Sequence, residues 1–150
     1  MQFTTVFFAL AALATVAVAS PAIVERDTKV MSGIISHDAM AHWIANTDAE
    51  LTFIGERFNP LDKRAALATT VTYCTKRAGT ICGGTCSVYT GGATCLATPG
   101  TVCMTSTRDI GYCDTAGCNG NCGDLAQCGE TLENGFCFVP GTESVLVSPI

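Results

Sequence analysis

Residues 73–86 read YCTKRAGTICGGTC, and this stretch decides the fold because it begins a dense framework of cysteines. The chain has 150 residues and ten cysteines, all of them between residues 74 and 137. The ten are Cys74, Cys82, Cys86, Cys95, Cys103, Cys113, Cys118, Cys122, Cys128 and Cys137. An even number of cysteines crowded into a short region is typical of a disulfide framework, so we expect five disulfides.

A zinc site is the alternative for closely spaced cysteines. Zinc sites favour pairs separated by two residues, usually with a histidine nearby. Here the close pairs, Cys82/Cys86 and Cys118/Cys122, are separated by three residues, and both histidines precede the cysteine region. We therefore expect disulfides, with no metal and no cofactor.

Two parts of the cysteine region, residues 73–103 and 112–142, align as pseudo-repeats. Each begins with Tyr-Cys, continues to a C-x3-C with glycine inside it, and contains Pro-Gly-Thr near its end. Duplication and chance similarity both remain open. Five cysteines lie in each half, so complete pairing requires at least one bridge between the halves. The alignment leaves Cys103 and Cys128 unmatched, and we expect these two to form that bridge; the other pairings stay open.

The segments between the cysteines favour β-structure. They are β-branched or aromatic runs at residues 69–74, 85–90, 93–98 and 136–141, separated by Gly-Gly, Asn-Gly and Pro-Gly turns. We predict a small, disulfide-rich, mainly β domain of short antiparallel hairpins, with one helical turn within residues 122–132. The C-terminal residues 142–150 are expected to form either an edge strand or a frayed tail.

A polar linker, residues 58–64, precedes the cysteine region and ends in the dibasic pair Lys63-Arg64. Exposed linkers of this kind are where proteolysis concentrates. We predict kexin-type cleavage after Arg64, which divides a pro-segment (20–64) from a mature cysteine-rich domain (65–150). An uncleaved surface pair is the alternative. Lys76-Arg77 is a second dibasic pair, which we expect a bridge through Cys74 to keep folded and tethered.

The pro-segment contains a short predicted helix, residues 36–46. Ser36 can cap its start, Asn46 can end it, and Met40, Trp43 and Ile44 lie on one face. Residues 47–55 then predict either a second helix cap or a short strand from residue 51. We interpret residues 20–64 as weakly structured.

The first 20 residues, MQFTTVFFALAALATVAVAS, predict a signal peptide, residues 1–19, with cleavage after Ala19. It departs from the usual pattern in one respect, because its n-region lacks Lys and Arg. A membrane anchor is the alternative, but the apolar run is shorter than the roughly 20 residues that cross a bilayer. We therefore expect a secreted, extracellular protein without a membrane span.

The mature region is mildly acidic, with three cations and six anions and thus a net charge of −3. The cations are Lys76, Arg77 and Arg108; the anions are Asp109, Asp114, Asp124, Glu130, Glu133 and Glu143. Binding to nucleic acid needs a basic surface, and so does binding to an anionic membrane, so we expect neither partner.

Cleavage after Arg64 would remove both histidines, His37 and His42, and the single tryptophan, Trp43. Ser-His and Cys-His nucleophile pairs would then be impossible. Carboxylate pairs remain as alternatives for acid–base chemistry, namely Asp109 with Asp114 or Glu130 with Glu133. We favour solvated surface charges for these four, and therefore expect no enzyme and no catalytic residue.

The layout of signal peptide, pro-segment ending in Lys63-Arg64 and compact cysteine-dense domain resembles the fungal small secreted cysteine-rich proteins. That broad class includes effectors, elicitors and antimicrobial peptides. The resemblance implies an extracellular role in virulence or competition, and it transfers no functional residues. We expect a protein that binds a protein or a cell-wall component at a host or competitor surface.

Three other binding roles stay open. A peptidase inhibitor would present residues 96–102, or residues 105–112 with Arg108, as a stapled loop. An antimicrobial or toxin-like protein is disfavoured by the acidic charge. A sugar-binding module would use exposed aromatic rings from the set Tyr73, Tyr89, Tyr112, Phe136 and Phe138, although we favour core packing for these residues.

Overall fold

The computed structural model describes residues 33–61 and 67–149, so the predicted signal peptide and the Lys63-Arg64 site lie outside the described residues. Within them the chain forms one helix, seven strands and two short 3-10 turns. They are α1 (His37–Asn46), β1 (Glu50–Gly55), β2 (Thr69–Ala78), β3 (Ile81–Gly91), β4 (Thr94–Ser106), β5 (Gly111–Cys113), β6 (Cys122–Asp124), η1 (Leu125–Gln127), η2 (Glu133–Gly135) and β7 (Cys137–Val147). The predicted disulfide-rich, mainly β class is confirmed.

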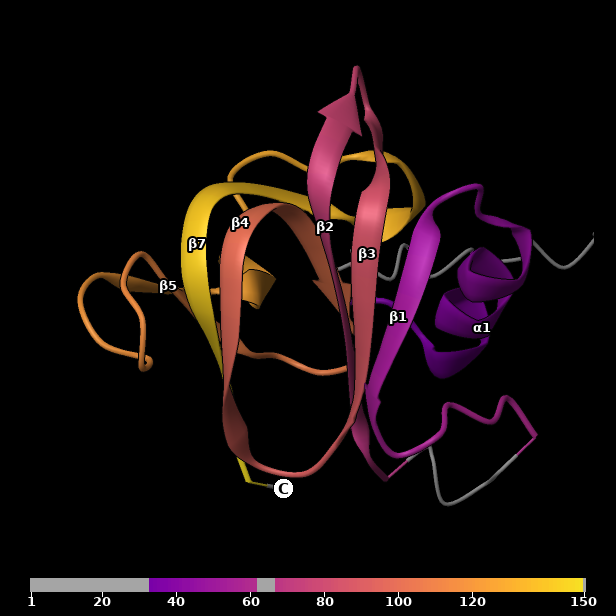
Figure 1. Cartoon of the computed structure of the whole chain (residues 1–150), viewed down its shortest axis with the longest axis horizontal. Coiled ribbons are helices and arrows are strands. Elements are labelled where there is room, and N and C mark those ends of the chain that lie inside the picture. Colours follow the sequence, from indigo (N-terminus) through magenta and orange to yellow (C-terminus); the bar gives the residue numbers. More distant parts are fainter. Residues whose placement is uncertain (1–32, 62–66, 150) are drawn as a thin grey trace, which may run out of the picture.

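All seven strands belong to one sheet, in the order β1-β3-β2-β4-β7-β5-β6 (Figure 1). Neighbouring strands run antiparallel, except that β1 runs parallel to β3. Every β-branched or aromatic run predicted as a strand lies in β2, β3, β4 or β7, apart from one or two flanking residues. The strands of this central group are 10 to 13 residues long, so they are longer than the predicted short hairpins.

The C-terminal part of the chain is an interior strand, which corrects the prediction of an edge strand or frayed tail. Residues 142–147 lie in β7, which pairs with β4 on one side and with β5 on the other. Val145 and Val147 are buried, whereas Leu146 between them is 42% exposed. The alternation gives this strand one buried face, and its apolar residues hold it inside the sheet.

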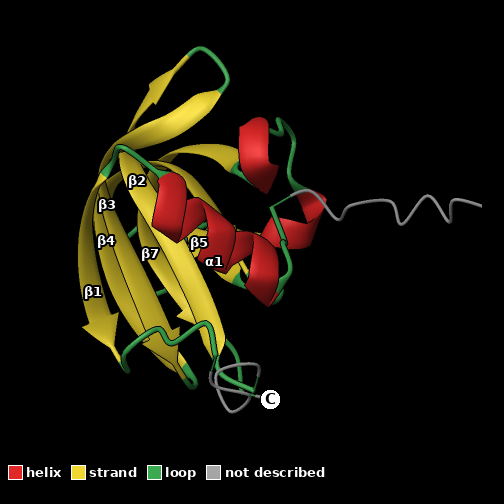
Figure 2. Ribbon diagram, turned by 90° about the vertical axis from the view of Figure 1, so that its right-hand side faces the viewer, coloured by secondary structure: helices red, strands yellow, loops and turns green. Residues whose placement is uncertain are grey.

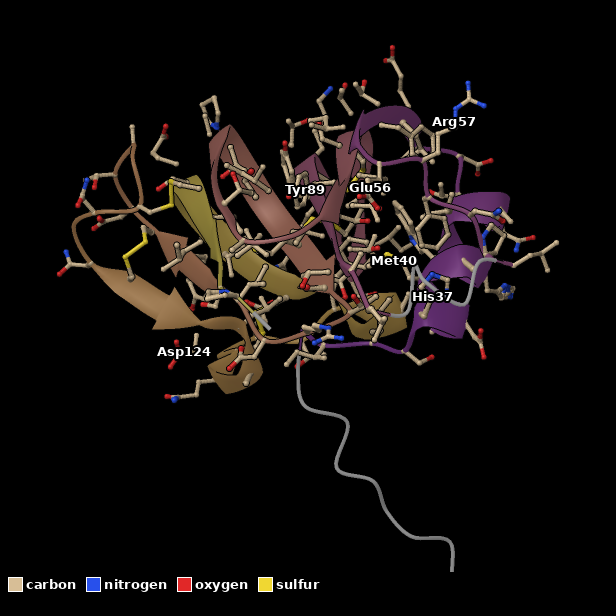
Figure 3. All side chains as sticks on the ribbon, turned by 90° about the horizontal axis from the view of Figure 1, so that it is seen from below. His37, Met40, Glu56, Arg57, Tyr89 and Asp124 are labelled. Carbon is tan, nitrogen blue, oxygen red and sulfur yellow. A yellow bond between two sulfur atoms is a disulfide. The ribbon has the colours of Figure 1, made fainter. Side chains whose placement is uncertain are left out.

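Helix α1 forms where the sequence predicts a helix. The Ser36 hydroxyl accepts a hydrogen bond from the Ala39 backbone N–H at 3.1 Å, which caps the first turn. The helix lies across one face of the sheet (Figure 2), and Met40 lies on the side of the helix that faces the strands (Figure 3). The Thr72 hydroxyl of β2 donates to the Met40 Sδ at 3.2 Å. The helix is therefore packed on the sheet through its apolar face.

The core beneath α1 combines aromatic rings with disulfide sulfur. The rings of Trp43 and Phe136 lie 4.9 Å apart between centroids. They belong to a buried cluster that also contains Leu132, Cys74, Cys82, Cys86 and Cys103. A second buried cluster, centred on Val71, Met104 and Val145, fills the space between the other strands. The sulfur atoms thus occupy core volume that aliphatic side chains fill in larger domains.

Five disulfides are present, as predicted, and no cysteine of the described region is free. They are Cys74–Cys86, Cys82–Cys103, Cys95–Cys118, Cys113–Cys122 and Cys128–Cys137. One of these bridges, Cys95–Cys118, joins the two halves, which agrees with the parity argument. The pseudo-repeat alignment is reproduced in one respect, because Cys74–Cys86 and Cys113–Cys122 occupy matching positions.

The expected Cys103–Cys128 bridge is wrong. Cys103 on β4 pairs with Cys82, because the outer part of the β2–β3 hairpin brings the two Cα atoms within 6.0 Å. Cys128 pairs with Cys137, because the loop between β6 and β7 returns to place their Cα atoms 5.8 Å apart.

Residues 33–61 are part of the same sheet and core as the cysteine-rich region, so they are not weakly structured. The Ile35 backbone N–H donates to the Ser106 carbonyl at 2.8 Å, and the Ser106 N–H donates to the Gly33 carbonyl at 3.0 Å. Six residues of β1 pair in register with β3. Whether the chain is cut after Arg64 remains a prediction, but a boundary at residue 64 does not separate two folded units.

Replacing the central ring of this core tests the packing. We expect Trp43→Ala to lower the free energy of unfolding by about 3–5 kcal/mol, because Trp43 is 9% exposed and truncating its side chain leaves a cavity in the core. Denaturant unfolding followed by far-ultraviolet circular dichroism measures the change. His42→Ala is the matched control, since His42 is exposed on the same helix and should change stability by about 0.5 kcal/mol or less. Equal effects of the two substitutions would contradict the account.

Candidate functional site

A groove of about 540 Å³ lies between α1, the outer part of the β2–β3 hairpin and η2. Its volume falls in the range of about 300–1,000 Å³ that small-molecule pockets occupy. One wall consists of Trp43 and Asn46 of α1 and of residues 47–49, which follow the helix. The opposite wall is formed by residues 76–78 and 81–84 of the hairpin, and η2 adds Glu133 and Asn134.

A bulge in β3 shapes the hairpin wall. Cys74 pairs with Cys86, but Lys76 pairs with Gly83, so β3 carries one extra residue at this point. Gly84 has φ +83°, and a Cβ there would lie 2.9 Å from the Lys76 Cβ, which explains the glycine. A bulge bends its strand and increases the local twist. Figure 2 shows the hairpin tip leaning over the face of the sheet that carries α1.

Polar contacts hold the hairpin tip against the loop that contains η2. The Arg77 Nη2 lies 2.7 Å from the Glu130 Oε1, and the Arg77 guanidinium carbon lies 4.1 Å from the centre of the Phe138 ring. The Thr80 hydroxyl donates to the Glu133 Oε1 at 2.7 Å, and the Glu133 N–H donates to the Thr80 carbonyl at 2.9 Å. These contacts join the hairpin tip to the loop that forms the neighbouring part of the groove.

The same contacts explain why the second dibasic pair stays within the fold. Arg77 lies in β2, where its Nε also donates to the Gly79 carbonyl at 2.9 Å. A processing protease must draw an arginine side chain into its specificity pocket, and Arg77 is already bound. The disulfides Cys74–Cys86 and Cys82–Cys103 span this position on both sides.

Part of β3 presents an unpaired strand edge to the groove. Strand β1 pairs with β3 only from Thr85 to Thr90. Among the described residues no strand pairs with the outer edge of residues 81–84, and all four of these residues line the groove. Unpaired strand edges carry backbone N–H and C=O groups that can bond another chain.

The side chains around this edge are apolar and of both charges. Ile81 is 56% exposed, and Lys76 and Asp48 are exposed on opposite walls. Trp43 also lines the groove and is 9% exposed. This combination can hold an extended peptide through its backbone, one apolar side chain and charged flanks.

The groove could not be predicted from the sequence, because one wall belongs to the predicted pro-segment (20–64) and the other to the predicted mature domain (65–150). The predicted cleavage after Arg64 assigns these two parts to separate molecules. The Gly83-Gly84 pair was the one local signal for the bulge, and it was interpreted as a turn. The apolar face of the 36–46 helix was a signal that this helix needs a packing partner.

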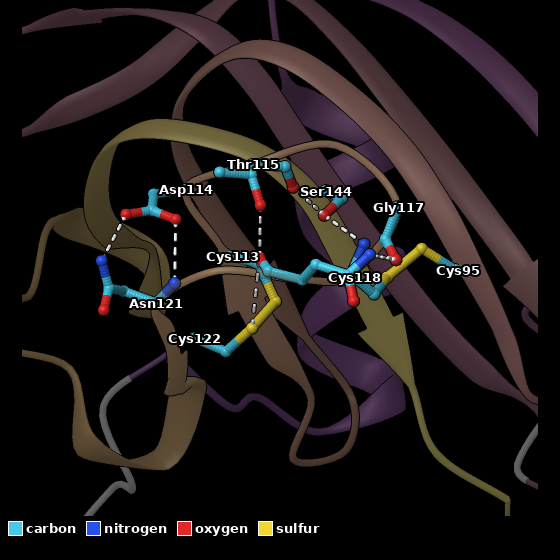
Figure 4. Close-up of a disulfide and its surroundings, with 10 residues drawn as sticks. Cys95, Cys113, Asp114, Thr115, Gly117, Cys118, Asn121, Cys122 and Ser144 are labelled. Atoms are coloured by element: carbon cyan, nitrogen blue, oxygen red, sulfur yellow. Dashed lines mark hydrogen bonds between the residues drawn. A yellow bond between two sulfur atoms is a disulfide. The ribbon is translucent and has the colours of Figure 1, made fainter.

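A second feature is a loop, residues 114–121, that two disulfides hold (Figure 4). Cys113–Cys122 closes its base, and Cys95–Cys118 fastens its middle to β4. The Ser144 hydroxyl accepts a hydrogen bond from the Cys118 N–H at 2.9 Å and donates to the Thr115 carbonyl at 2.5 Å. The loop is largely exposed, and its side chains are small or polar.

Asp114 organises the base of this loop. Its carboxylate accepts hydrogen bonds from the Asn121 side-chain amide at 2.9 Å and from the Asn121 backbone N–H at 3.0 Å. These bonds favour the charged form, so the Asn121 side chain, and then its backbone, lower the pKa of Asp114. Because the pKa of Asp114 is lowered on folding, its charged form stabilises the folded chain at higher pH. This stabilisation is lost as the pH falls through the folded-state pKa.

The carboxylates considered for catalysis bind different partners. Asp109 accepts a hydrogen bond from the Ala126 N–H, and Asp114 binds Asn121. Glu130 pairs with Arg77, and Glu133 accepts from Thr80. In the described part of the chain, no group of three or more His, Cys, Asp or Glu side chains is placed to hold a metal ion.

Both histidines lie on α1, His37 at its first residue and His42 in its middle. The His37 ring stacks on Phe58 with 4.9 Å between centroids, and the His42 Nδ1 lies 3.0 Å from the Asn46 Nδ2. Of the aromatic residues considered for sugar binding, Phe136 is fully buried and Tyr89 is 9% exposed, which confirms core packing for these two. Phe138 is half-buried under Arg77.

The segments considered as inhibitory loops are largely strand or buried. Residues 96–102 belong to β4, in which Thr98 and Thr101 are buried. Within residues 105–112, Thr105, Ser106 and Ile110 are buried. Arg108, which would be displayed by that loop, is half-buried.

No protein-family model, curated protein or solved structure matches this chain. Among the helices of the described residues, none has the length and apolar character that a bilayer crossing needs. The functional argument therefore starts from the groove itself.

Acidification tests the role of Asp114. We expect the Asn121 amide proton to lose protection from hydrogen exchange as the pH falls through the lowered pKa of Asp114, because the protonated carboxyl is a weaker acceptor. Nuclear magnetic resonance of the folded chain measures the exchange at each pH. Asp114→Asn is the matched control, since it keeps the shape and cannot titrate. If Asn121 still loses its protection at the same pH in the Asp114→Asn variant, a group other than Asp114 causes the loss.

Proposed function

We propose that this chain is a non-enzymatic extracellular protein that binds an extended segment of a partner protein in the groove beside β3. The observation that carries the proposal is the open strand edge at residues 81–84, which lies inside a groove of about 540 Å³. A partner at the surface of a host or competitor organism fits the predicted secretion. Five disulfides in a small domain are typical of proteins that work outside the cell.

An extended peptide fits this edge because its backbone has the same spacing of donors and acceptors as a strand. Strand addition obtains affinity from backbone hydrogen bonds and specificity from pockets for alternate side chains. Strand β1 begins opposite Thr85 and leaves residues 81–84 of β3 unpaired on that side. The bound segment would pair with these four residues, on the same edge of β3 as β1. Ile81 would contact an apolar side chain, and Lys76 and Asp48 would select the flanking charges.

A sugar fits the groove less well. Sugar-binding sites stack a pyranose on an exposed aromatic face. Trp43 is the aromatic residue in the groove lining, and it is 9% exposed because its ring packs against Phe136. The groove thus offers little ring surface for stacking.

The groove is already present in the ligand-free chain. The contacts of Arg77 with Glu130 and of Thr80 with Glu133 tie the hairpin to the loop before β7. Disulfide Cys82–Cys103 ties the same hairpin to β4. A preformed site loses less conformational entropy on binding, so a short segment can bind without ordering the protein.

Peptide selection tests the proposal. A displayed library of linear peptides is selected against the full chain, and the affinities of the selected peptides are measured by isothermal titration calorimetry. We expect Ile81→Ser to weaken binding about tenfold or more, which corresponds to about 1.4 kcal/mol. Leu146→Ser is the control, since Leu146 is 42% exposed on β7 and does not line the groove.

The backbone contacts have a separate test. Two versions of each peptide are made, N-methylated either at the odd-numbered or at the even-numbered residues. One of the two versions should lose binding, because its methyl groups replace the backbone N–H donors that face β3. Selected peptides that bind equally well to Ile81→Ser, or that tolerate N-methylation in both registers, would contradict strand addition in this groove.

A further inference from the structure

Residues 33–61 are held to the rest of the molecule without a covalent cross-link. All ten cysteines lie from Cys74 onward, and the five disulfides join them to one another. The chain between residues 61 and 67 is therefore the one covalent connection between the two parts. The noncovalent contacts between these two parts decide whether they stay together when that connection is cut.

Three separate elements fix residues 33–61 in place. The N-terminal residues bond Ser106 of β4, through the Ile35 N–H at 2.8 Å and the Gly33 carbonyl at 3.0 Å. Helix α1 buries Met40 and Trp43 against β2 and the loop before β7. Strand β1 adds six paired residues along β3, and the Glu56 N–H donates to the Thr90 carbonyl at 2.9 Å.

The two surfaces also approach each other closely. A Cβ on Gly33 would lie 2.6 Å from the Leu125 Cγ, and a Cβ on Gly55 would lie 2.5 Å from the Thr90 carbonyl oxygen. On the other surface, a Cβ on Gly135 would collide with the Ile35 Cγ2. Glycine on both sides of the contact allows an approach that other residues would prevent at these three positions.

The larger part, residues 67–149, presents a binding surface of definite shape to this segment. The surface consists of the β3 edge from Thr85 to Thr90 and an apolar area around Phe136 and Leu132. Its matching partner is an amphipathic helix followed by an extended strand, which is what residues 37–55 supply.

We infer that residues 33–61 stay bound after the chain is cut between residues 61 and 67, so that the processed protein is a noncovalent two-chain molecule. The shorter chain then supplies Trp43 and residues 46–49, which are one wall of the groove. Removal of this chain would leave the β3 edge and the Phe136 area open. The predicted cleavage after Arg64 would accordingly convert one chain into two without releasing a pro-segment.

The test uses the full chain cut with a kexin-type protease, and Trp43 as the probe. Trp43 is the only tryptophan, so its emission reports directly on the shorter chain. We expect the two chains to co-elute in size-exclusion chromatography at micromolar concentration, with the emission of buried tryptophan unchanged. In detergent without reductant they should separate, because no disulfide joins them.

Unfolding gives a second readout. The midpoint of the cut protein should fall on tenfold dilution, whereas that of the uncut chain should not, since dissociation makes stability depend on concentration. Met40→Ala is the matched variant: it keeps Trp43 and removes a fully buried side chain at the contact, so more of the shorter chain should dissociate after cutting. Glu50→Ala, exposed at the start of β1, should behave like the parent.

Separation of the two chains at micromolar concentration, together with emission of solvent-exposed tryptophan, would overturn the inference and make residues 20–64 a removable pro-segment. If the kexin-type protease does not cut after Arg64, a variant in which residues 62–66 are replaced by the recognition site of another specific protease is cut instead. The same co-elution, emission and unfolding measurements then show whether the shorter chain stays bound. Retention is measured without any ligand, so the result is independent of whether the groove binds a peptide.

Discussion

The packing of Trp43 on Phe136 is the contact on which the rest of the structure depends. It joins α1 to the loop before β7, and it lies over the sulfur atoms of Cys74–Cys86 and Cys82–Cys103. Because a domain of this size has a thin core, one large ring accounts for much of the apolar burial beneath the helix. The contact also positions the turn after α1, and this turn is one wall of the groove.

The groove follows from constraints on the other wall. A bulge at Gly84 bends the β2–β3 hairpin, and Arg77 holds the bent hairpin against the loop that contains Glu130. Strand β1 begins at Glu50, opposite Thr85, so among the described residues no strand pairs with the first part of β3, residues 81–84, on that side. Proteins usually cover or charge such edges to prevent aggregation. Here residues 81–84, which carry the edge, line the groove.

Local signals were sufficient to predict much of the fold. The strands around the cysteines have β-branched runs and glycine turns, and α1 has Ser36 at its start and Asn46 at its end. What could not be predicted depends on contacts between distant residues. Examples are the parallel pairing of β1 with β3 and the choice of Cys82 as the partner of Cys103. The change in cysteine content near residue 64 indicated a domain boundary, whereas the apolar face with Met40 and Trp43 indicated a segment that packs on the sheet.

Native-state hydrogen exchange of the full chain tests most directly whether residues 33–61 belong to the folded core. If they do, the hydrogen-bonded amides in the last turn of α1, and those of β1 that bond β3, will exchange through the same opening as the amides of β2 and β4. The opening free energies of these amides will then equal the global free energy of unfolding, and all of them will decrease in parallel as denaturant is added. Fast exchange of α1 and β1, with β2, β4 and β7 still protected, would show that the segment is a detachable appendage and would contradict the account.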